Sequence, residues 1–237
     1  MNDTPENKRI ALVTGASRGI GRAAAVALAA SGCHVILSAR TAGALEEVDD
    51  EIRAAGGSAS IVKLNLAHGD KIDALGPSLY PRWDRLDVLV AAGGILGRLG
   101  PLAHLPNEEW DQVLAVNLTA NWRLIRSLDP LLRRSEAGRA LFVTSRAAHK
   151  IRAYWGPYAV SKAGLEALVK TYAEEVQTTP VKVNLLDPGA TRTKMRALAY
   201  PGEKAESVKP PDALAPLILR LTSPDCMTHG EVIAADG

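Results

Sequence analysis

A glycine-rich turn between an apolar run and an alanine-rich run constrains the fold of this chain more than any other feature. Residues 10–14, Ile-Ala-Leu-Val-Thr, have the character of a short buried strand, and Gly15-Ala-Ser-Arg-Gly-Ile-Gly21 follows directly. The alanine-rich run over 22–31 then predicts a helix that stops at Gly32. A strand, a tight glycine turn and a helix in this order are typical of the first unit of a parallel α/β sheet.

The alternation of strand and helix continues to the end of the chain. Apolar strands that are buried on both faces indicate a parallel sheet, and right-handed crossovers place helices on both of its faces. The further strands are predicted at 34–39, 60–64, 86–90, 140–144, 181–186 and 231–235, and the further helices at 44–55, 70–80, 107–134, 158–177 and 212–221. We therefore expect an α/β fold with a Rossmann-type doubly wound parallel sheet of about seven strands.

Local signals refine this outline. Asn107 has the chemistry of an N-cap for the long helix that follows it, and Gly76-Pro77 is expected to shorten the helix over 70–80. No repeat, low-complexity run or long linker divides the sequence, so residues 1–237 are expected to form a single domain. The segment 192–211 has the least regular pattern and is expected to be a flap over the substrate.

Composition argues against several classes of protein. The net charge of +2 gives no strong field, so we expect neither nucleic acid nor a membrane as a partner. Cys33 and Cys226 lie far apart, in no metal-binding spacing, which favours a reducing compartment without disulfides or a metal site. The polar start of the chain lacks the features of a signal peptide, and the apolar runs are too short to span a bilayer. We expect a cytoplasmic protein.

The glycine turn also has the features of a phosphate site. Small residues let the backbone approach a diphosphate, and the following helix offers free N–H groups and a partial positive charge. The spacing is Gly-xxx-Gly-x-Gly rather than the Gly-x-Gly-x-x-Gly of the general dinucleotide motif, so a tight turn that binds nothing remains the alternative. The position of the turn between the first strand and a helix favours binding.

Two arginines indicate which dinucleotide this turn would hold. An acid at the end of the second strand would accept from the ribose hydroxyls of NAD, whereas an arginine favours the 2′-phosphate of NADP. The second predicted strand ends in Ser38-Ala-Arg40 with no adjacent acid, and Arg18 lies in the glycine turn. Either arginine alone fits a solvated loop equally well. Together they favour NADP(H) over NAD(H), because guanidinium groups bind phosphate in a bidentate manner.

A tyrosine and a lysine four residues apart form the candidate catalytic pair. Tyr158 and Lys162 share one helix face, and Ser145 lies at the end of the preceding strand, where open α/β sheets bind ligands. An ammonium group and a nicotinamide charge would both favour the phenolate and lower the tyrosine pKa from about 10. Tyr158 could then exchange a proton with an alcohol or a carbonyl, while Ser145 donates to the same oxygen. Such a pair on an exposed helix face is the alternative.

The chain resembles the short-chain dehydrogenase/reductases from Ile10 to Gly237. The motifs that carry the resemblance are Thr14-Gly-Ala-Ser-Arg-Gly-Ile-Gly21, Asn117 in Val116-Asn-Leu118, Ser145, Tyr158-xxx-Lys162, and Asp187-Pro-Gly189 leading to Thr191 and Thr193. The interval from Ser145 to Tyr158 is also the one usual in that family. Several independent motifs in the right order make an accidental likeness improbable.

The resemblance implies a role for each member of a catalytic tetrad. Tyr158 would be the acid/base, Ser145 would orient the substrate oxygen, and Lys162 would lower the tyrosine pKa and bind the nicotinamide ribose. Asn117 would hold a water in a proton relay behind Lys162. The residues expected to contact the cofactor are Gly15, Ser17, Arg18, Gly19, Ile20, Gly21, Arg40, Asn65, Leu66, Ala92, Gly93, Gly94, Tyr158, Lys162, Pro188, Gly189, Thr191 and Thr193.

Two departures from the family pattern concern the cofactor site. The family commonly has Asn-Asn-Ala-Gly after the fourth strand, where this chain has Ala91-Ala-Gly-Gly94, so the local bracing of the sheet is expected to differ. Asn65 replaces the acid that usually meets the adenine amine, and its amide oxygen can still accept from that amine. Neither departure touches the tetrad, so an active enzyme is expected.

The function that follows is hydride transfer between NADP(H) and a small carbonyl or alcohol. The alternatives are a regulator that senses NADPH without turnover and an enzyme that acts on nucleotide sugars; the intact tetrad argues against the first and the short C-terminal part against the second. The substrate pocket is expected around residues 96–99, Arg146, His149, Tyr154, Trp155 and 192–211. The family's usual assembly implies a homodimer or homotetramer built on the two long helices.

Overall fold

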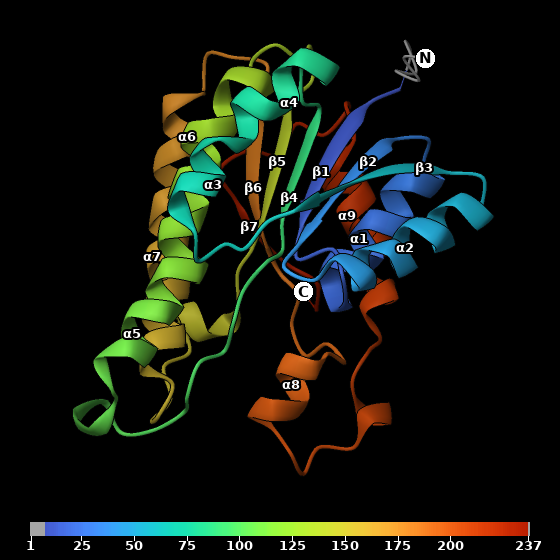
Figure 1. Cartoon of the computed structure of the whole chain (residues 1–237). Coiled ribbons are helices and arrows are strands. Elements are labelled where there is room, and N and C mark those ends of the chain that lie inside the picture. Colours follow the sequence, from blue (N-terminus) through green and yellow to red (C-terminus); the bar gives the residue numbers. More distant parts are fainter. Residues whose placement is uncertain (1–7, 237) are drawn as a thin grey trace.

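The computed structural model of the protein describes residues 8–236. Seven parallel strands form one sheet in the order β3-β2-β1-β4-β5-β6-β7 (Figure 1). Their bounds are β1 Ile10–Thr14, β2 His34–Ala39, β3 Ser58–Lys63, β4 Val88–Ala91, β5 Arg139–Val143, β6 Lys182–Asp187 and β7 Val232–Ala234. The strand order reverses between β1 and β4, and ligands of open α/β sheets bind at such a switch point. The predicted Rossmann-type fold is confirmed.

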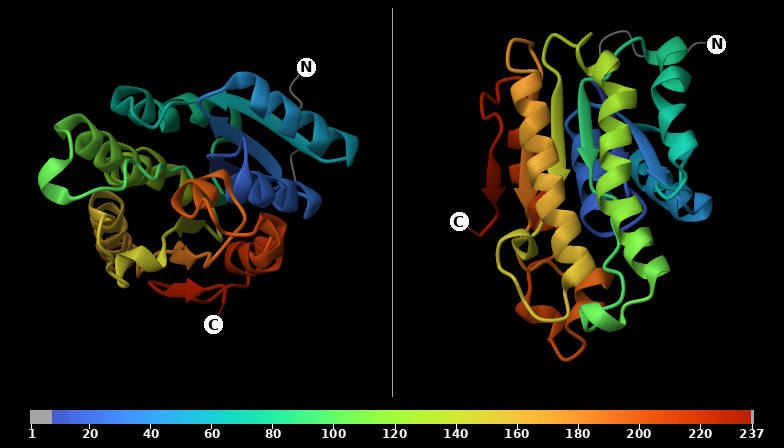
Figure 2. Two further views of the ribbon diagram at one scale, coloured as in Figure 1. Left: turned by 90° about the horizontal axis from the view of Figure 1, so that it is seen from below. Right: turned by 90° about the vertical axis from the view of Figure 1, so that its left-hand side faces the viewer.

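Helices cover both faces of this sheet (Figures 1 and 2). One face carries α3 (Gly69–Asp73), α4 (Leu75–Trp83), α5 (Asn107–Leu114), α6 (Ala120–Leu132) and α7 (Gly156–Glu175). The other face carries α1 (Gly19–Ala30), α2 (Ala42–Ala54) and α9 (Ala215–Thr222), while α8 (Lys194–Ala199) lies beyond the carboxyl edge of the strands. The sheet therefore exposes its carboxyl edge to the loops and to the segment that contains α8.

The core consists of two apolar layers, one on each face of the sheet. Successive side chains of a strand point to opposite faces. Leu12 of β1 accordingly packs with Phe142 and the residues of α6 and α7, whereas Val13 packs with Leu28 of α1 and Leu45 of α2. Both faces are buried, which explains why the strands have continuous apolar runs rather than alternating ones.

The long helix predicted over 107–134 is interrupted. A π turn over Ala115–Thr119 separates α5 from α6, and it contains Asn117. The sequence has no glycine or proline at this point, so it carries no local signal for the interruption. The prediction that Asn107 is the N-cap is also wrong: Pro106 occupies that position and Asn107 is the first helical residue.

The helix predicted over 70–80 is two helices, α3 and α4, that meet at Ala74. Pro77 has no N–H to donate to the carbonyl of Asp73, and the Ser127 hydroxyl of α6 donates to that carbonyl instead, at 3.1 Å. The break therefore precedes Gly76-Pro77, and α4 continues to Trp83, so the expected shortening is wrong. Similarly, the helix expected at 212 begins as a 3₁₀ turn over Pro211–Leu214 before α9.

The contact of α4 with α6 yields a test of packing at Gly76. A Cβ at this position would lie 1.9 Å from the Ser127 carbonyl oxygen, whereas a Cβ at Gly43 of α2 would meet nothing within 4 Å. We expect Gly76→Ala to lower the free energy of unfolding by roughly 1–3 kcal/mol, because the helices must separate. Gly43→Ala is the matched control and should be neutral or stabilising by up to about 1 kcal/mol. Urea denaturation of both variants measures the difference, and equal stabilities would contradict the argument.

Candidate active site

Three loop segments meet at the carboxyl edge of the sheet: 15–21 after β1, 92–94 after β4, and 188–193 after β6. The backbone N–H of Gly93 donates to the Thr14 hydroxyl at 3.2 Å, which ties the second segment to the first. A Cβ at Gly19 would lie 3.3 Å from the Thr193 methyl group, so the third segment also borders the glycine turn. Residues that the sequence separates by more than a hundred positions thus share one edge.

The glycine turn is packed too closely to accept side chains. Gly15 has a φ of +68°, and a Cβ there would lie 2.8 Å from the Cα of Gly93. A Cβ at Gly21 would lie 2.2 Å from the Gly15 carbonyl oxygen. This cradle of bare backbone stands at the start of α1, and free N–H groups of a helix N-terminus attract phosphate. The residues present therefore fit the diphosphate of a dinucleotide.

The four tetrad residues come from three elements that pack beside this turn. Asn117 lies in the π turn, Ser145 follows β5, and Tyr158 and Lys162 lie one turn apart on α7. Lys162 is 5% exposed, its Nζ donates to the Val143 carbonyl at 2.8 Å, and it lies 5.8 Å from the centre of the Tyr158 ring. The ammonium and the phenol thus share one buried corner, as their spacing on the helix predicts.

Asn117 is fully buried and its amide braces the segment after β4. Its Oδ1 accepts from the Ile95 N–H at 2.9 Å, and its Nδ2 donates to the Ile95 carbonyl at 2.9 Å and to the Ser161 hydroxyl at 3.1 Å. A Cβ at Gly94 would lie 3.3 Å from Oδ1 and 3.8 Å from the Lys162 Nζ. Asn117 therefore positions the backbone that runs between itself and Lys162. Its part in a water relay stays a prediction.

Burial dominates the electrostatics of the tetrad. It lowers the pKa of Lys162 to about 8, while the Glu166 carboxylate acts in the opposite direction. It raises the pKa of Tyr158, the Asp187 carboxylate adds to that rise, and the Ser145 side chain opposes it. The protein by itself therefore shifts the tyrosine pKa upward, opposite to the expected lowering. The phenolate loses its hydration in this buried corner, and that loss exceeds what the neighbouring groups return.

The remaining residues expected at the cofactor also reach this edge. Asn65 accepts from the Ala67 N–H at 3.1 Å and so closes a turn directly after β3. A Cβ at Gly93 would lie 2.4 Å from a methyl carbon of Leu66, and Ala92 packs on the layer that contains α1. Arg40 follows β2, whose end is tied to the glycine turn by a bond of 3.1 Å from the Ala16 N–H to the Ser38 carbonyl.

The segment after β6 is ordered by its own hydrogen bonds. The Gly189 N–H donates to the Asp187 carboxylate at 3.0 Å, with Gly189 at a φ of +64°. The buried Thr191 hydroxyl donates to the Pro188 carbonyl at 3.0 Å. The Thr193 hydroxyl accepts from the Arg196 N–H at 3.1 Å and caps α8. The structure thus presents Pro188-Gly189 as a tight turn beside the tetrad.

The segment 192–211, predicted as a flap, leaves the rest of the fold and returns to it at the same place. Thr191 and Lys209 form a β-bridge, and the Arg192 N–H donates to the Lys209 carbonyl at 2.8 Å. Between them, Tyr200 packs its ring 5.7 Å from the Trp155 ring, and its hydroxyl accepts from Arg152 at 2.6 Å. The segment therefore closes on the loop before α7, and it contains a short helix that its pattern did not predict.

Sequence reasoning missed two residues here. Tyr200 gains its role from the path of the flap, which no local pattern reveals. Glu166 is buried on α7 one turn after Lys162, and an acid among the apolar positions of a helix is the signal that could have found it. His149, expected near the substrate pocket, lies with its Nδ1 3.4 Å from the Glu166 carboxylate.

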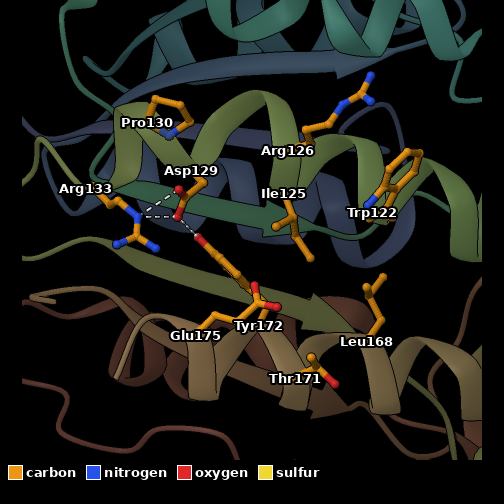
Figure 3. A pocket seen from close by; sticks show the side chains of 10 residues that line it. All are labelled: Trp122, Ile125, Arg126, Asp129, Pro130, Arg133, Leu168, Thr171, Tyr172 and Glu175. Carbon is orange, nitrogen blue, oxygen red and sulfur yellow. Dashed lines mark hydrogen bonds and ion pairs between the residues drawn. The ribbon is translucent and has the colours of Figure 1, made fainter. Parts of the chain in front are cut away.

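Two hollows open on the surface beside α7. One, of about 360 Å³, lies between α6 and α7, and the Tyr172 hydroxyl there donates to Asp129 at 2.8 Å (Figure 3). The other, of about 400 Å³, lies at the start of α7 and includes Tyr154. Neither hollow is lined by a tetrad residue.

Residues 8–236 contain neither a cluster of metal-binding side chains nor a membrane-spanning helix. No group of three or more His, Cys, Asp or Glu side chains in this part of the chain could hold a metal ion. Nor does any helix described by the structure have the length and apolar character needed to cross a membrane.

Comparison with known proteins identifies close relatives of this site and fold. A family model described as short chain dehydrogenase matches residues 9–204. The oxidoreductase YciK of Escherichia coli (strain K12) is 37% identical over 92% of this chain and 88% of its own, and a 3-oxoacyl-[acyl-carrier-protein] reductase of a Synechocystis species is 37% identical over 79% and 76%. A short chain dehydrogenase structure from Escherichia coli CFT073, complexed with NADPH, is 35% identical, with a TM-score of 0.93 over 98% of both chains.

The buried ammonium of Lys162 should weaken the fold. Its pKa is about 8 in the folded protein against 10.5 for a free lysine, so between these values the unfolded chain binds more protons and stability rises with pH. We expect Lys162→Met to raise the free energy of unfolding near neutral pH by roughly 1–3 kcal/mol, with the gain fading from about pH 8 to 10.5. Lys170→Met, at an exposed site of α7, is the control without such a gain. A wild-type protein more stable than Lys162→Met at neutral pH, in denaturant titrations, would contradict this.

Proposed function

The chain belongs to the short-chain dehydrogenase/reductase family of NAD(P)-dependent oxidoreductases, and from this we propose that it transfers a hydride between NADP(H) and a small carbonyl or alcohol. One observation carries the proposal. Tyr158, Lys162 and Ser145 gather at the carboxyl edge of the sheet, beside a glycine cradle that fits a diphosphate. A regulator without turnover has no support from the relatives, which are oxidoreductases by name.

In this proposal Tyr158 exchanges a proton with the substrate oxygen, and Ser145 donates a hydrogen bond to that oxygen as its charge develops. When bound, the nicotinamide supplies or accepts the hydride. Lys162 holds a positive charge next to the phenol, and Asn117 fixes the backbone of Gly94 and Ile95 beside the ammonium. Asn117 is further proposed to hold the relay water behind Lys162.

Burial raises the pKa of Tyr158, so its phenol is protonated at neutral pH in the protein alone. In the reductive reaction this phenol would give its proton to the carbonyl oxygen. The reverse reaction needs the phenolate, which the positive ring of the oxidised cofactor would favour.

The proposed preference for NADP(H) rests on Arg40 and Arg18. Both are exposed at the carboxyl edge, one after β2 and one at the start of α1, so a 2′-phosphate could lie between them. Within residues 8–236 neither side chain takes part in an ion pair that would need to break. The relative from Escherichia coli CFT073 has NADPH bound, which agrees with this preference.

We assign the substrate to the space between the tetrad and the segment 192–211, which we propose to act as a flap. The rings of Tyr200, Trp155 and Tyr158 follow one another at 5.7 and 5.9 Å, so the flap reaches the proposed acid through two aromatic contacts. An aromatic wall of this kind suits an apolar substrate body next to the reacting carbonyl.

Assembly is proposed to use α6 and α7. Their outer faces carry the hollow of Figure 3, and Trp122 beside it is 42% exposed, which is unusual for so large a side chain. A second copy of the chain related by a two-fold axis could cover these faces, giving a homodimer or homotetramer. Both cysteines are free and buried, which agrees with the proposed cytoplasmic location.

Replacing Tyr158 by Phe tests the acid/base assignment. We expect turnover of a panel of carbonyl compounds (ethyl acetoacetate, butanedione, an aromatic aldehyde) to fall by roughly 10²–10⁴-fold, because the proton donor is lost. NADPH affinity, measured by fluorescence titration, should stay nearly unchanged. Tyr80→Phe removes a surface phenol from α4 and is the matched control. Undiminished turnover in Tyr158→Phe would remove this residue from its role.

Replacing Arg40 by Asp tests the cofactor preference. A lost charge-assisted hydrogen bond and a new like charge should weaken NADPH binding by roughly 10–100-fold, while NADH binding holds or improves. Arg82→Asp makes the same charge change on α4, before β4 and therefore at the opposite edge of the sheet, and should leave the ratio of the two affinities unchanged. Equal affinities of the wild-type protein for NADPH and NADH, indifferent to Arg40→Asp, would refute the phosphate site.

A further inference from the structure

Glu166 is a buried acid that the proposed reaction does not use. It lies on α7, one turn after Lys162, and is 6% exposed. Burying a carboxylate costs free energy unless hydrogen bonds and an opposite charge compensate it. An acid kept at such a place therefore needs partners, and its partners lie directly beneath the tetrad.

The first partner is the residue next to the proposed catalytic serine. The Thr144 hydroxyl donates to Oε1 of Glu166 at 2.8 Å, and both groups are buried. The Thr144 N–H donates to the Leu186 carbonyl of β6 at 2.9 Å, so the backbone and the side chain of this residue are both fixed. Ser145 follows in the chain, and its position depends on that double attachment.

Lys162 contacts Val143, the residue before Thr144. Its Nζ donates to the Val143 carbonyl, while Glu166 accepts from Thr144. Two side chains one turn apart on α7 thus hold two consecutive residues at the end of β5. This pair of contacts connects the helix that bears Tyr158 to the strand end that bears Ser145.

The charge of Glu166 also acts on Lys162. Glu166 raises the pKa of Lys162 against the effect of burial. Two titratable groups face the carboxylate: Lys162 from α7 and His149 from the loop after β5. On β6, the Asp187 carboxylate acts on Tyr158. Loss of the Glu166 charge would leave the buried ammonium without its acidic neighbour on the helix.

We propose that Glu166 is a positioning residue of this active site, which holds Ser145 in place through Thr144 and keeps Lys162 in its charged form. The inference rests on the proposed function, because Ser145 and Lys162 are groups of that reaction. It adds a fifth polar side chain to the tetrad. Glu166 itself does not touch the reacting atoms.

The charge role is tested by NADPH binding as a function of pH, which needs no substrate. Glu166→Gln keeps the size of the side chain and removes its charge. We expect its NADPH affinity to equal that of the wild-type protein near pH 6. As the pH rises and Lys162 loses its proton, the affinity of the variant should decline at a pH about one unit or more below the pH at which the wild-type affinity declines. Glu166→Asp restores the charge and should restore most of the wild-type profile. Glu174→Gln, exposed near the end of α7, and His149→Gln are controls that should leave the profile unchanged.

The placement of Ser145 is tested separately with Thr144→Val. This variant removes the hydroxyl and leaves every charge in place, so the pH profile of NADPH binding should match the wild type. Turnover of ethyl acetoacetate with NADPH should fall by roughly 10-fold, with kcat affected more than KM, because Ser145 acts on the developing charge. An unchanged kcat in Thr144→Val would overturn the role in placing Ser145.

The remaining outcomes separate this inference from the proposed function. If Glu166→Gln follows the wild-type pH profile of NADPH binding, the charge role is wrong, whatever the turnover of this variant. If His149→Gln shifts the profile as Glu166→Gln does, the histidine carries the effect and the role assigned to Glu166 is wrong. Full turnover in Tyr158→Phe overturns the proposed function, while the pH profile of NADPH binding still reports on Glu166 and Lys162. Thermal melting identifies variants that fail to fold, and Glu166→Asp and Thr144→Val then decide the two roles.

Discussion

The burial of one ammonium group, that of Lys162, determines which groups surround the tetrad. Lys162 carries its charge into a corner closed by the end of β5, the π turn and α7, and it makes a hydrogen bond to a backbone carbonyl there. A buried charge needs compensating partners and space. Glu166 lies one turn away, the Val143 carbonyl accepts from the amine, and Gly94 leaves room where a side chain would crowd it. Burying a charge opposes folding, so the rest of the structure must stabilise a site that weakens it.

The sheet provides that stability and also places the loops. Its five inner strands are buried on both faces, mostly by aliphatic side chains, with Phe142 as the one phenylalanine of the sequence. Because all seven strands run in the same direction, the glycine turn, the four tetrad residues and the segment 192–211 meet at one edge although they come from distant parts of the chain. The apolar layers and these polar loops therefore occupy different parts of the structure. The segment that joins β6 to α9 leaves and rejoins the fold at the bridge between Thr191 and Lys209.

Much of this was predictable from the sequence. The bounds of β1 and β2 match the expected ones, and the other strands differ by one or two residues at each end, because runs of apolar side chains directly reflect burial. The spacing of Tyr158 and Lys162 fixed their common face. Three features escaped prediction because they depend on contacts across the fold: the π turn around Asn117, the upward shift of the Tyr158 pKa, and the attachment of Thr144 to Glu166. A sequence shows which residue is present, but not how much water surrounds it.

The π turn has a consequence for how this helix can change. Five residues, 115–119, accommodate one more residue than a regular turn holds, so α5 and α6 keep different angular registers on the same rod. Each residue of an α-helix turns the chain by about 100°, so a deletion of one residue there would rotate one half of the helix relative to the other by about that angle, away from its packing partners. A loop can change its length without moving the elements around it, but this stretch cannot. The direction of the Asn117 side chain depends on the number of residues in the π turn, so an insertion or deletion there would turn the side chain away from Ile95 and Ser161.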